Sequence, residues 1–471
     1  MKAAQSHAPP SAPSLPLVGD ALAMAGDIGA FFTRQYLKLG PVFRVRALHR
    51  RFTVLAGPEA NLFVTRKGSK HLRSREFWMD FDKEFGAARS MLSMDGAEHA
   101  RMRKAQQPGY SRSFIHEHLH DVIAITRREV AEWPLDEPVP GLYALQRIIT
   151  EQLGTVAAGV SPRDYLDDMI VFVRTILAAR VTRQRPAVLM RTPRFRRARQ
   201  RVEELYATVR AVHDPDRRSV AEPDLVDNLL ALHHVDPQFL PETDLMPALL
   251  GPFIAGLDTV GSTCAFMLYA LLKHPDLLDR MTAEADASFA HGTLTAEAVR
   301  HLDVTHRVAL ETLRMYPIAP AITRTVSNTF EFAGYTIPAG ETVMVATTVP
   351  HHLPQYFPEP ERFDIERYTP ERREHRQPGV FAPFGAGPHV CLGAGFAEVA
   401  IAATMATIVH EVELALDPPD YVLKISPVPT PSPDDRFRIR VKRRRRRAAD
   451  ATSGMEESPR ERPTPSASGG T

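Results

Sequence analysis

The stretch Phe384-Gly385-Ala386-Gly387-Pro388-His389-Val390-Cys391-Leu392-Gly393 decides the fold. Its three glycines and one proline exclude a regular helix. The residues that follow predict a helix over roughly 393–416, which places Cys391 at a helix N-terminus. Free main-chain N–H groups and the helix dipole there favour a thiolate over a thiol. Because a thiolate is a soft ligand that binds iron well, we expect Cys391 to bind iron; the alternative is a buried structural cysteine in a glycine-rich turn.

Composition limits the classes of protein that remain. The 471 residues include only one other cysteine, Cys264, which lies in an apolar run and is expected to be a buried small side chain. Two cysteines make a disulfide framework unlikely and fit a reducing compartment. Lys and Arg number 58 against 56 Asp and Glu, and the resulting net charge of +2 argues against a general nucleic-acid-binding surface.

Helical patterns dominate the first three hundred residues, for example over 28–39, 99–112, 114–133 and 142–158. Strand patterns are short: 42–45 is expected to pair with 52–55, and 330–337 with 342–348. We predict a mainly α protein with a smaller β-rich part, in a single large domain over residues 17–442. Residues 1–16 are rich in proline and are expected to be a flexible lead-in. Residues 443–471 begin with five arginines and are expected to be a solvated, disordered tail.

The apolar run from Met246 to Leu272 contains one charge, Asp258, together with several glycines, and it predicts a core helix rather than a membrane span. In the middle of this run, Gly256 should weaken the helix, and the Thr259 hydroxyl can compete for the Ala255 carbonyl. Together they could open a groove for dioxygen and water. The alternative is a slightly polar face of a buried helix.

The cysteine loop resembles the signature of the cytochrome P-450 family. Phe384, Gly387, Cys391 and Gly393 fall at the spacing of that family, and Gly385 and His389 also fit. The resemblance implies a haem-thiolate protein in which Cys391 is the axial ligand of haem b (iron protoporphyrin IX). It also implies that Phe384 packs beside the thiolate and that His389, where many members have Arg, contacts a propionate.

Other motifs carry the same resemblance. Glu311 and Arg314, three residues apart in a helix that ends before Pro317, resemble the Glu-Xaa-Xaa-Arg motif of the family. The segment 360–363 resembles the motif that supplies a third partner, so the implied structural network is Glu311, Arg314 and Arg362. On its own, the first pair would be a common surface salt bridge.

The segment 255–259 is similar to the oxygen-activation motif of the family, which assigns oxygen activation to Thr259 and proton relay to Asp258. His99 and Arg103, four apart on one predicted helix face, and Arg324 are at positions where the resemblance implies contacts to the haem propionates. Without the resemblance, His99 and Arg103 would belong to a solvated helix.

The implied reaction inserts one oxygen atom from dioxygen into a hydrophobic small molecule, as hydroxylation or epoxidation. Electrons are expected from NAD(P)H through a separate ferredoxin or flavodoxin with its reductase, in the cytoplasm of a bacterium, with the protein acting as a monomer without nucleic acid. Two alternatives remain: a peroxygenase or rearranging haem-thiolate enzyme, and a non-catalytic haem sensor or binder. The expected walls of the substrate pocket are apolar: Phe253, Ile254, Ala255, Ile318, Ala319 and Ile322, with the aromatic stretch Phe77, Trp78, Phe81 and Phe85.

Overall fold

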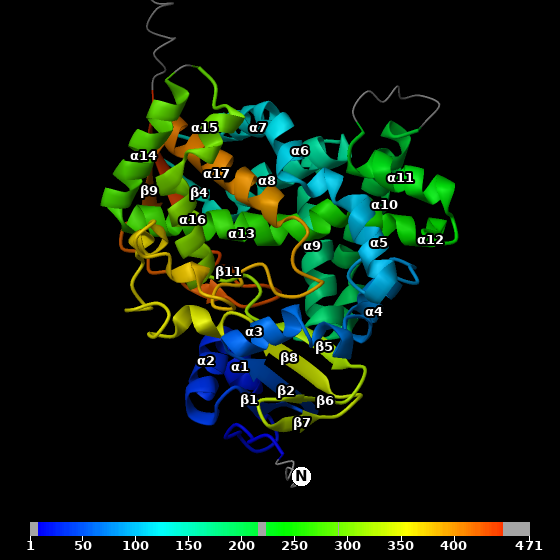
Figure 1. Cartoon of the computed structure of the whole chain (residues 1–471). Coiled ribbons are helices and arrows are strands. Elements are labelled where there is room, and N and C mark those ends of the chain that lie inside the picture. The colour runs from blue at the N-terminus through cyan, green and yellow to red at the C-terminus, as the bar shows by residue number, and fades with distance from the viewer. Residues whose placement is uncertain (1–7, 215–222, 291, 446–471) are drawn as a thin grey trace, which may run out of the picture.

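The computed structural model describes residues 8–214, 223–290 and 292–445. These residues form two parts of different content: helices fill the larger part, and a sheet with the first helices of the chain makes up the smaller one (Figure 1). The predicted mainly α architecture with a smaller β-rich part is therefore confirmed.

The sheet of the β-rich part has five strands in the order β1-β2-β8-β5-β3. The predicted antiparallel pair is confirmed, because β1 (Val42–Ala47) faces β2 (Arg50–Ala56). β8 (Thr342–Ala346) runs parallel to β2 and antiparallel to β5 (Ile322–Val326), whose other neighbour is β3 (Leu72–Arg73). β5 therefore lies between β8 and the edge strand β3, and the segment before β5 enters the sheet from the helical part.

The predicted pairing of 330–337 with 342–348 is wrong. The first segment folds back on itself, so that β6 (Phe330–Phe332) pairs with β7 (Tyr335–Ile337). The two residues between these strands, Ala333 and Gly334, both have positive φ angles, 51° and 85°. Positive φ angles at both positions are those of a two-residue hairpin turn. The sequence Ala-Gly is not among the pairs that usually indicate such a turn.

The predicted flexible lead-in is also wrong over residues 10–12, whereas residues 1–7 lie outside the described residues. The Arg44 N–H donates to the Pro10 carbonyl at 2.7 Å, and the Ala12 N–H donates to the Arg44 carbonyl at 2.8 Å. Ala12 is buried. The lead-in therefore covers the free edge of β1, whose main-chain groups would otherwise lack partners.

The helical part is built around α13 (Gly251–Lys273), which crosses it between α8 (Gly141–Ala158), α16 (Asp303–Met315) and α17 (Ala394–Glu411) (Figure 1). Within the described ranges, one helical stretch, Glu242–Lys273, is long and apolar enough to span a membrane, and 78% of its most apolar window is buried inside the protein. This stretch comprises α12 (Glu242–Leu249) and α13. The prediction of a core helix is confirmed.

Two glycines bring α13 close to α8. A Cβ atom on Gly256 would lie 2.4 Å from Leu153 Cδ1, and one on Gly261 would lie 2.9 Å from Gln146 Cγ. α13 is helical throughout Gly251–Lys273. The helix therefore continues through Gly256, whose missing side chain makes room for Leu153.

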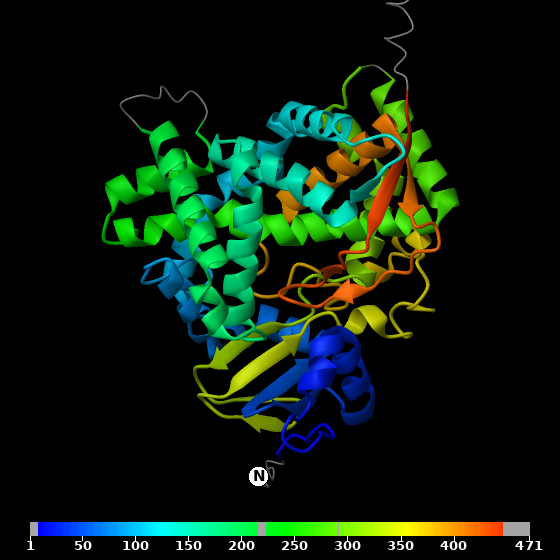
Figure 2. The ribbon, with the colours of Figure 1, turned by 180° about the vertical axis from the view of Figure 1, so that it is seen from behind.

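A three-stranded sheet in the order β4-β12-β9 closes the far end of the helical part (Figure 2). β4 (Pro138–Pro140) and β9 (Val412–Asp417) flank β12 (Arg438–Arg444). α17 therefore ends at Glu411, before the predicted end at 416, because residues from Val412 onward are extended and pair with β12.

The arginine run belongs in part to this sheet. Arg443 pairs with Glu413, Arg444 donates to the carbonyls of Ala131 and Trp133, and Arg445 pairs with Asp286. The prediction of a disordered tail is wrong for residues 443–445, because strand pairing, ion pairs and hydrogen bonds to main-chain carbonyls order them, although Arg443 and Arg444 are exposed as expected. Residues 446–471 lie outside the described residues.

Most other predicted helices are present with shifted ends. α2 (Ile28–Leu39) matches its prediction, and the Asp27 carboxylate caps it by accepting from the Ala30 N–H at 2.8 Å. The predicted helix over 114–133 is divided at His118 into two. The remaining helices and strands are α1 (Ala21–Gly26), α3 (Pro58–Thr65), α4 (Arg75–Glu84), α5 (Gly96–Gln106), α6 (Arg112–Glu117), α7 (Leu119–Ala131), α9 (Leu166–Ile176), α10 (Pro193–Val212), α11 (Leu225–Val235), α14 (Pro275–Phe289), α15 (Ala296–Arg300), β10 (Ile425–Ser426) and β11 (Ser432–Pro433).

Candidate active site

The cysteine loop is a tight turn held by its own main chain. The Cys391 N–H donates to the Phe384 carbonyl at 2.9 Å, and the Val390 N–H donates to the Gly387 carbonyl at 3.0 Å. Gly385 and Gly387 have φ angles of +80° and +82°, a region that favours glycine. A Cβ on Gly387 would also lie 2.9 Å from the Val64 carbonyl oxygen of α3. The glycine spacing is therefore required by the turn that presents Cys391.

The two cysteines have opposite surroundings. Cys264 is fully buried in α13, and burial raises the pKa of its thiol to about 12. Cys391 is exposed. It lies just before Gly393, the N-cap of α17, as the sequence predicted.

The pKa of the Cys391 thiol differs from the expectation of a free thiolate. Burial by the surrounding chain raises it, although the Gly393 N–H and the positive charge of Arg103 act to lower it. The helix N-terminus alone therefore does not outweigh desolvation. A bound metal cation would favour the thiolate.

Thr259 lies on α13 as predicted. Its hydroxyl donates to the Ala255 carbonyl, one turn earlier, at 2.6 Å. Ala255 is exposed, although most of its neighbours along α13 are buried. The Thr259 hydroxyl is thus oriented by the helix, beside a small side chain that leaves space next to it.

Asp258 lies one residue before Thr259 and is 1% exposed. Its Oδ1 accepts from the Arg174 Nε at 2.8 Å and from the Gln146 Nε2 at 2.7 Å. Burial raises the pKa of this carboxyl, and Arg174 and Gln146 act to lower it. Because 29% of the Arg174 side chain is exposed, this ion pair connects a buried carboxylate to the surface. Sequence reasoning missed both partners.

The four cations expected at the haem propionates come together beside the cysteine loop. The rings of His99 and His389 stack with centroids 3.9 Å apart. The Arg103 Nη1 donates to the Val390 carbonyl at 2.7 Å, which ties α5 to the loop. Arg324 is 7% exposed, and its guanidinium donates to the Thr323 carbonyl at 2.8 Å.

One carboxylate faces this group. Asp95 Oδ1 lies 3.3 Å from His389 Nε2, and the Asp95 carboxylate accepts from the Ser74 and Arg75 N–H groups. Burial lowers the pKa of His99 to about 4, and it lowers the pKa of Arg324 to about 10 although Asp95 acts in the opposite direction. We call His99, Arg103, Arg324, His389 and Asp95 the cation cluster. Its two arginines outnumber its one acid, and its histidines can add N–H donors, so it fits an anionic ligand.

The predicted Glu311–Arg314 pair is present and fully buried. The Arg314 Nε donates to Glu311 Oε2 at 2.7 Å, and its Nη2 donates to Oε1 at 2.8 Å. The third member is Arg367, whose Nε donates to Glu311 Oε1 at 3.3 Å and whose side chain is also fully buried. The prediction of Arg362 is wrong. Its side chain is 67% exposed and pairs with Glu359 at the surface, and it contributes only its main-chain carbonyl to the network.

Further neighbours complete this buried network, which consists of Glu311, Arg314, Arg367 and Tyr368. The Tyr368 hydroxyl donates to Glu311 Oε2 at 2.8 Å, and the Arg314 Nη1 donates to the His351 carbonyl at 2.8 Å. Arg367 also pairs with Glu374. The network joins α16 to the long irregular segment before the cysteine loop, as expected for a structural element.

The residues expected to line the substrate pocket occupy two segments. Phe253, Ile254 and Ala255 lie at the start of α13, and Ile318, Ala319 and Ile322 lie on the segment that leads into β5. Ala255 and Ala319 are exposed, and a Cβ on Gly385 of the cysteine loop would lie 3.8 Å from Ile322. Phe253 is 1% exposed and belongs to the same buried apolar cluster as Phe81 and Phe85, so it is part of the core rather than of an open wall.

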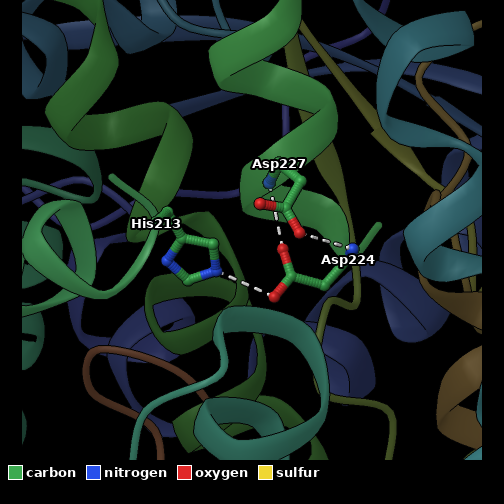
Figure 3. Close-up of side chains that lie close together, drawn as sticks. All are labelled: His213, Asp224 and Asp227. Atoms are coloured by element: carbon green, nitrogen blue, oxygen red, sulfur yellow. Dashed lines mark hydrogen bonds and ion pairs between the residues drawn. The ribbon is translucent and has the colours of Figure 1, made fainter. Parts of the chain in front are cut away.

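A second group of ionisable side chains lies away from the cysteine loop (Figure 3). His213, at the end of α10, places its Nε2 at 2.8 Å from Asp224 Oδ2, and Asp224 and Asp227 form the capping box of α11. These hydrogen bonds hold the start of α11 against the end of α10. They give the three residues a structural role.

Comparison with known proteins gives a consistent result. The sequence model of one family, described as Cytochrome P450, matches residues 9–432. A cyclooctat-9-en-7-ol 5-monooxygenase of Streptomyces melanosporofaciens is 27% identical over 434 residues, which cover 86% of this chain and 91% of the relative. A putative cytochrome P450 136 of Mycobacterium tuberculosis is also 27% identical, over 86% of this chain and 83% of its own.

Solved structures agree on the fold. The retinoic acid-bound cyanobacterial CYP120A1 superposes with a TM-score of 0.80 at 23% identity, over 93% of this chain and 99% of that one. The haem domain of cytochrome P450DA superposes with a TM-score of 0.79 at 22% identity, over 93% and 98%. The similarity in structure therefore extends over both the helical and the β-rich parts.

Proposed function

Because the chain belongs to the cytochrome P450 family, which is a family of oxidoreductases, we propose that it is a haem-thiolate monooxygenase. It inserts one oxygen atom from dioxygen into a hydrophobic organic molecule. The observation that carries this proposal is the pair of cysteines: one is sealed inside α13, and the other is exposed on a glycine-shaped loop beside an excess of cations.

Haem b fits the residues that surround Cys391. The Cys391 thiolate would hold the iron, whose charge would compensate for the desolvation that raises the pKa of the thiol. The cation cluster supplies partners for two propionates, with His99, Arg103, Arg324 and His389 as donors. Phe384 and Gly385 form the start of the same loop. When bound, haem supplies activation of dioxygen, with electron donation from a thiolate ligand.

The experiment that tests the ligand uses the two cysteines as a matched pair. The reduced protein with carbon monoxide should have the red-shifted absorption of a thiolate-ligated haem. Cys391→Ala should abolish this band, and Cys264→Ala should leave it. Loss of the band in Cys264→Ala alone would reject Cys391 as the ligand.

Proton delivery is the proposed task of Thr259 and Asp258. The Thr259 hydroxyl, held by the Ala255 carbonyl, can turn to donate a hydrogen bond toward the exposed side of α13. Asp258 is sealed from that side and held by Arg174, so it can pass a proton only when this ion pair opens. Arg174 thus positions Asp258, and its partial exposure provides the route to solvent.

Replacing the hydroxyl separates a monooxygenase from the alternatives. Thr259→Ala should still consume NAD(P)H with redox partners, but most of the product should be replaced by hydrogen peroxide. Asp258→Asn should mainly slow turnover, because the hydroxyl remains. The measurement is product formed per NAD(P)H consumed. An unchanged ratio in Thr259→Ala would favour a peroxide-using or rearranging enzyme, and haem binding without oxygen consumption would favour a sensor.

We propose that electrons come from NAD(P)H through a separate ferredoxin or flavodoxin with its reductase, in a bacterial cytoplasm. The substrate is hydrophobic, since the residues proposed to line its pocket are apolar: Ile254, Ala255, Ile318, Ala319 and Ile322. A screen of hydrophobic compounds for changes in the haem absorption identifies it.

A further inference from the structure

A surface hollow of about 570 Å³ lies between α4, α10 and the turns that connect α9 to α10. These turns are the π-helical turn η4 (Leu177–Val181) and the 3₁₀ turn η5 (Ala187–Arg191), and α4, α9 and α10 lie on one side of the molecule (Figure 1). Four guanidinium groups and one carboxylate line the hollow: Arg180, Arg191, Arg196, Arg199 and Glu84.

The charges of this hollow, which we call the arginine hollow, do not balance. Glu84 accepts from Arg180 at 2.6 Å and from Arg199 at 2.7 Å, so one carboxylate serves two guanidiniums. Arg191 and Arg196 have no ion pair with any described residue. The chain around them offers none either, because residues 174–202 include ten arginines and no Asp or Glu. The hollow therefore carries an excess of positive charge.

Local structure directs these charges to one place. α10 begins with Pro193, and the Thr192 hydroxyl caps it by accepting from the Phe195 N–H at 3.3 Å. Within α10, Phe195, Arg196 and Arg199 are three or four residues apart and share one face, and Arg191 ends the turn η5 just before the helix. Arg197 is exposed on the same helix but does not line the hollow.

The wall between the arginines is apolar. It includes Val188, which is 60% exposed, together with Met190 and Phe195. Phe195 stacks on Phe172, with ring centroids 5.7 Å apart, and Phe172 contacts Phe85 at 5.5 Å. These rings belong to the same apolar cluster as Phe253 of α13. A cationic rim around an apolar wall matches a molecule with an anionic head and an apolar body.

We propose that the arginine hollow binds the anionic head group of an amphipathic substrate, such as a carboxylate attached to an aliphatic chain. Arg191 and Arg196 donate to the anion, and Val188, Met190 and Phe195 contact the first carbons of the chain. Arg180 and Arg199, already paired with Glu84, shape the rim. The assignment of the ligand as a substrate rests on the proposed function, whereas the anion site itself does not.

Calorimetry with a matched set of ligands tests the site. Decanoate, 1-decanol and decylamine share one chain and differ in the head group. Decanoate should bind about tenfold more tightly than decanol, and decylamine should bind no better than decanol. Arg191→Gln with Arg196→Gln should weaken decanoate binding about tenfold and leave decanol unchanged. Arg197→Gln removes the same charge from the same helix outside the hollow and should change decanoate binding less than twofold.

Two results would overturn the proposal. Equal affinities for decanoate and decanol would exclude a head-group site. An equal loss of decanoate affinity in Arg197→Gln and in the variants of the hollow would show that the general positive charge of α10, and not the hollow, attracts the anion. Inorganic phosphate at millimolar concentration should compete with decanoate only weakly, because it lacks the chain. Stronger binding to vesicles of phosphatidylglycerol than to decanoate would assign the hollow to a membrane surface instead.

The haem spectrum then separates this inference from the proposed function. Decanoate should alter the haem absorption, and the Arg191→Gln, Arg196→Gln variant should need about tenfold more decanoate for the same change. Binding by calorimetry without any spectral change would overturn the assignment as a substrate site. Cys391→Ala should bind decanoate with unchanged affinity in calorimetry, so failure of the thiolate assignment leaves the anion site testable.

Discussion

The buried network and the cation cluster are two groups of charged side chains with opposite balance. In the buried network, Glu311 receives Arg314, Arg367 and Tyr368, and Arg367 also pairs with Glu374. In the cation cluster, Arg324 and the two histidines share one carboxylate among the described residues, Asp95, and Arg103 donates to a main-chain carbonyl. A buried group whose charges are balanced by its own members stabilises the fold. A group that keeps an excess of positive charge is suited to bind an anionic ligand.

The largest expected effect comes from removing the centre of the matched group. Glu311→Ala leaves Arg314 and Arg367 buried without their carboxylate, at a cost of about 3–5 kcal/mol or more in the free energy of unfolding. Little folded protein should be recovered. Glu311→Gln retains the shape and should fold at reduced temperature with a lowered urea midpoint. Normal stability in Glu311→Gln would show that the ion pairs do not hold the fold.

The next prediction applies the same change to the unmatched group. Arg324→Gln should leave the unfolding free energy of the haem-free protein within about 1 kcal/mol, because burial already disfavours this charge and lowers its pKa to about 10. The haem-loaded variant should lose haem to apomyoglobin about tenfold faster than the wild type. If the haem-free variant were strongly destabilised and the haem-loaded variant retained haem normally, Arg324 would stabilise the fold and would not bind haem.

A pH prediction follows from His351, which joins the matched group through its carbonyl. Its side chain is fully buried and its Nε2 accepts from the Ala382 N–H at 3.0 Å, so that nitrogen carries no proton. Burial lowers its pKa well below 6.5. Below pH 6.5 the unfolded chain binds a proton that the folded protein does not, so stability falls as pH falls, by about 1.4 kcal/mol per pH unit.

His351→Gln tests this slope, because the Gln amide oxygen can accept from the Ala382 N–H and does not titrate. Urea unfolding between pH 7 and pH 5 should show a shallower loss of stability in the variant, by about 1.4 kcal/mol per pH unit at most. Above pH 7 the two proteins should show parallel pH dependence. Identical slopes below pH 6.5 would mean that other groups dominate acid unfolding.

The smallest expected effect separates the observed third partner from the predicted one. Arg362→Ala should change the free energy of unfolding by less than about 0.5 kcal/mol, because its pair with Glu359 is exposed. Arg367→Ala, which removes a fully buried guanidinium, should resemble Glu311→Ala. A large loss of unfolding free energy in Arg362→Ala would show that Arg362 belongs to the buried network after all.

Sequence reasoning worked where one segment contains the whole signal. The glycine spacing around Cys391 is set by the backbone of a single loop, and Glu311 and Arg314 share one helix face. It failed where the partner comes from elsewhere. Arg174 lies 84 residues before Asp258, and the choice between Arg362 and Arg367 depends on how an irregular segment turns. Asp95 offered a local signal, since it precedes Gly96 as the N-cap of α5.

The sheet β4-β12-β9 has a consequence for the order in which the molecule can be completed during synthesis. Its central strand, β12, is the last strand of the described chain, and its two neighbours lie at 138–140 and 412–417. When a ribosome has made the cysteine loop and α17, β4 still lacks its partner strand, and β9 and β12 have yet to be made. Arg444, the last residue of β12, also binds the carbonyls at the end of α7. The helical part therefore closes only after nearly the whole described chain has emerged.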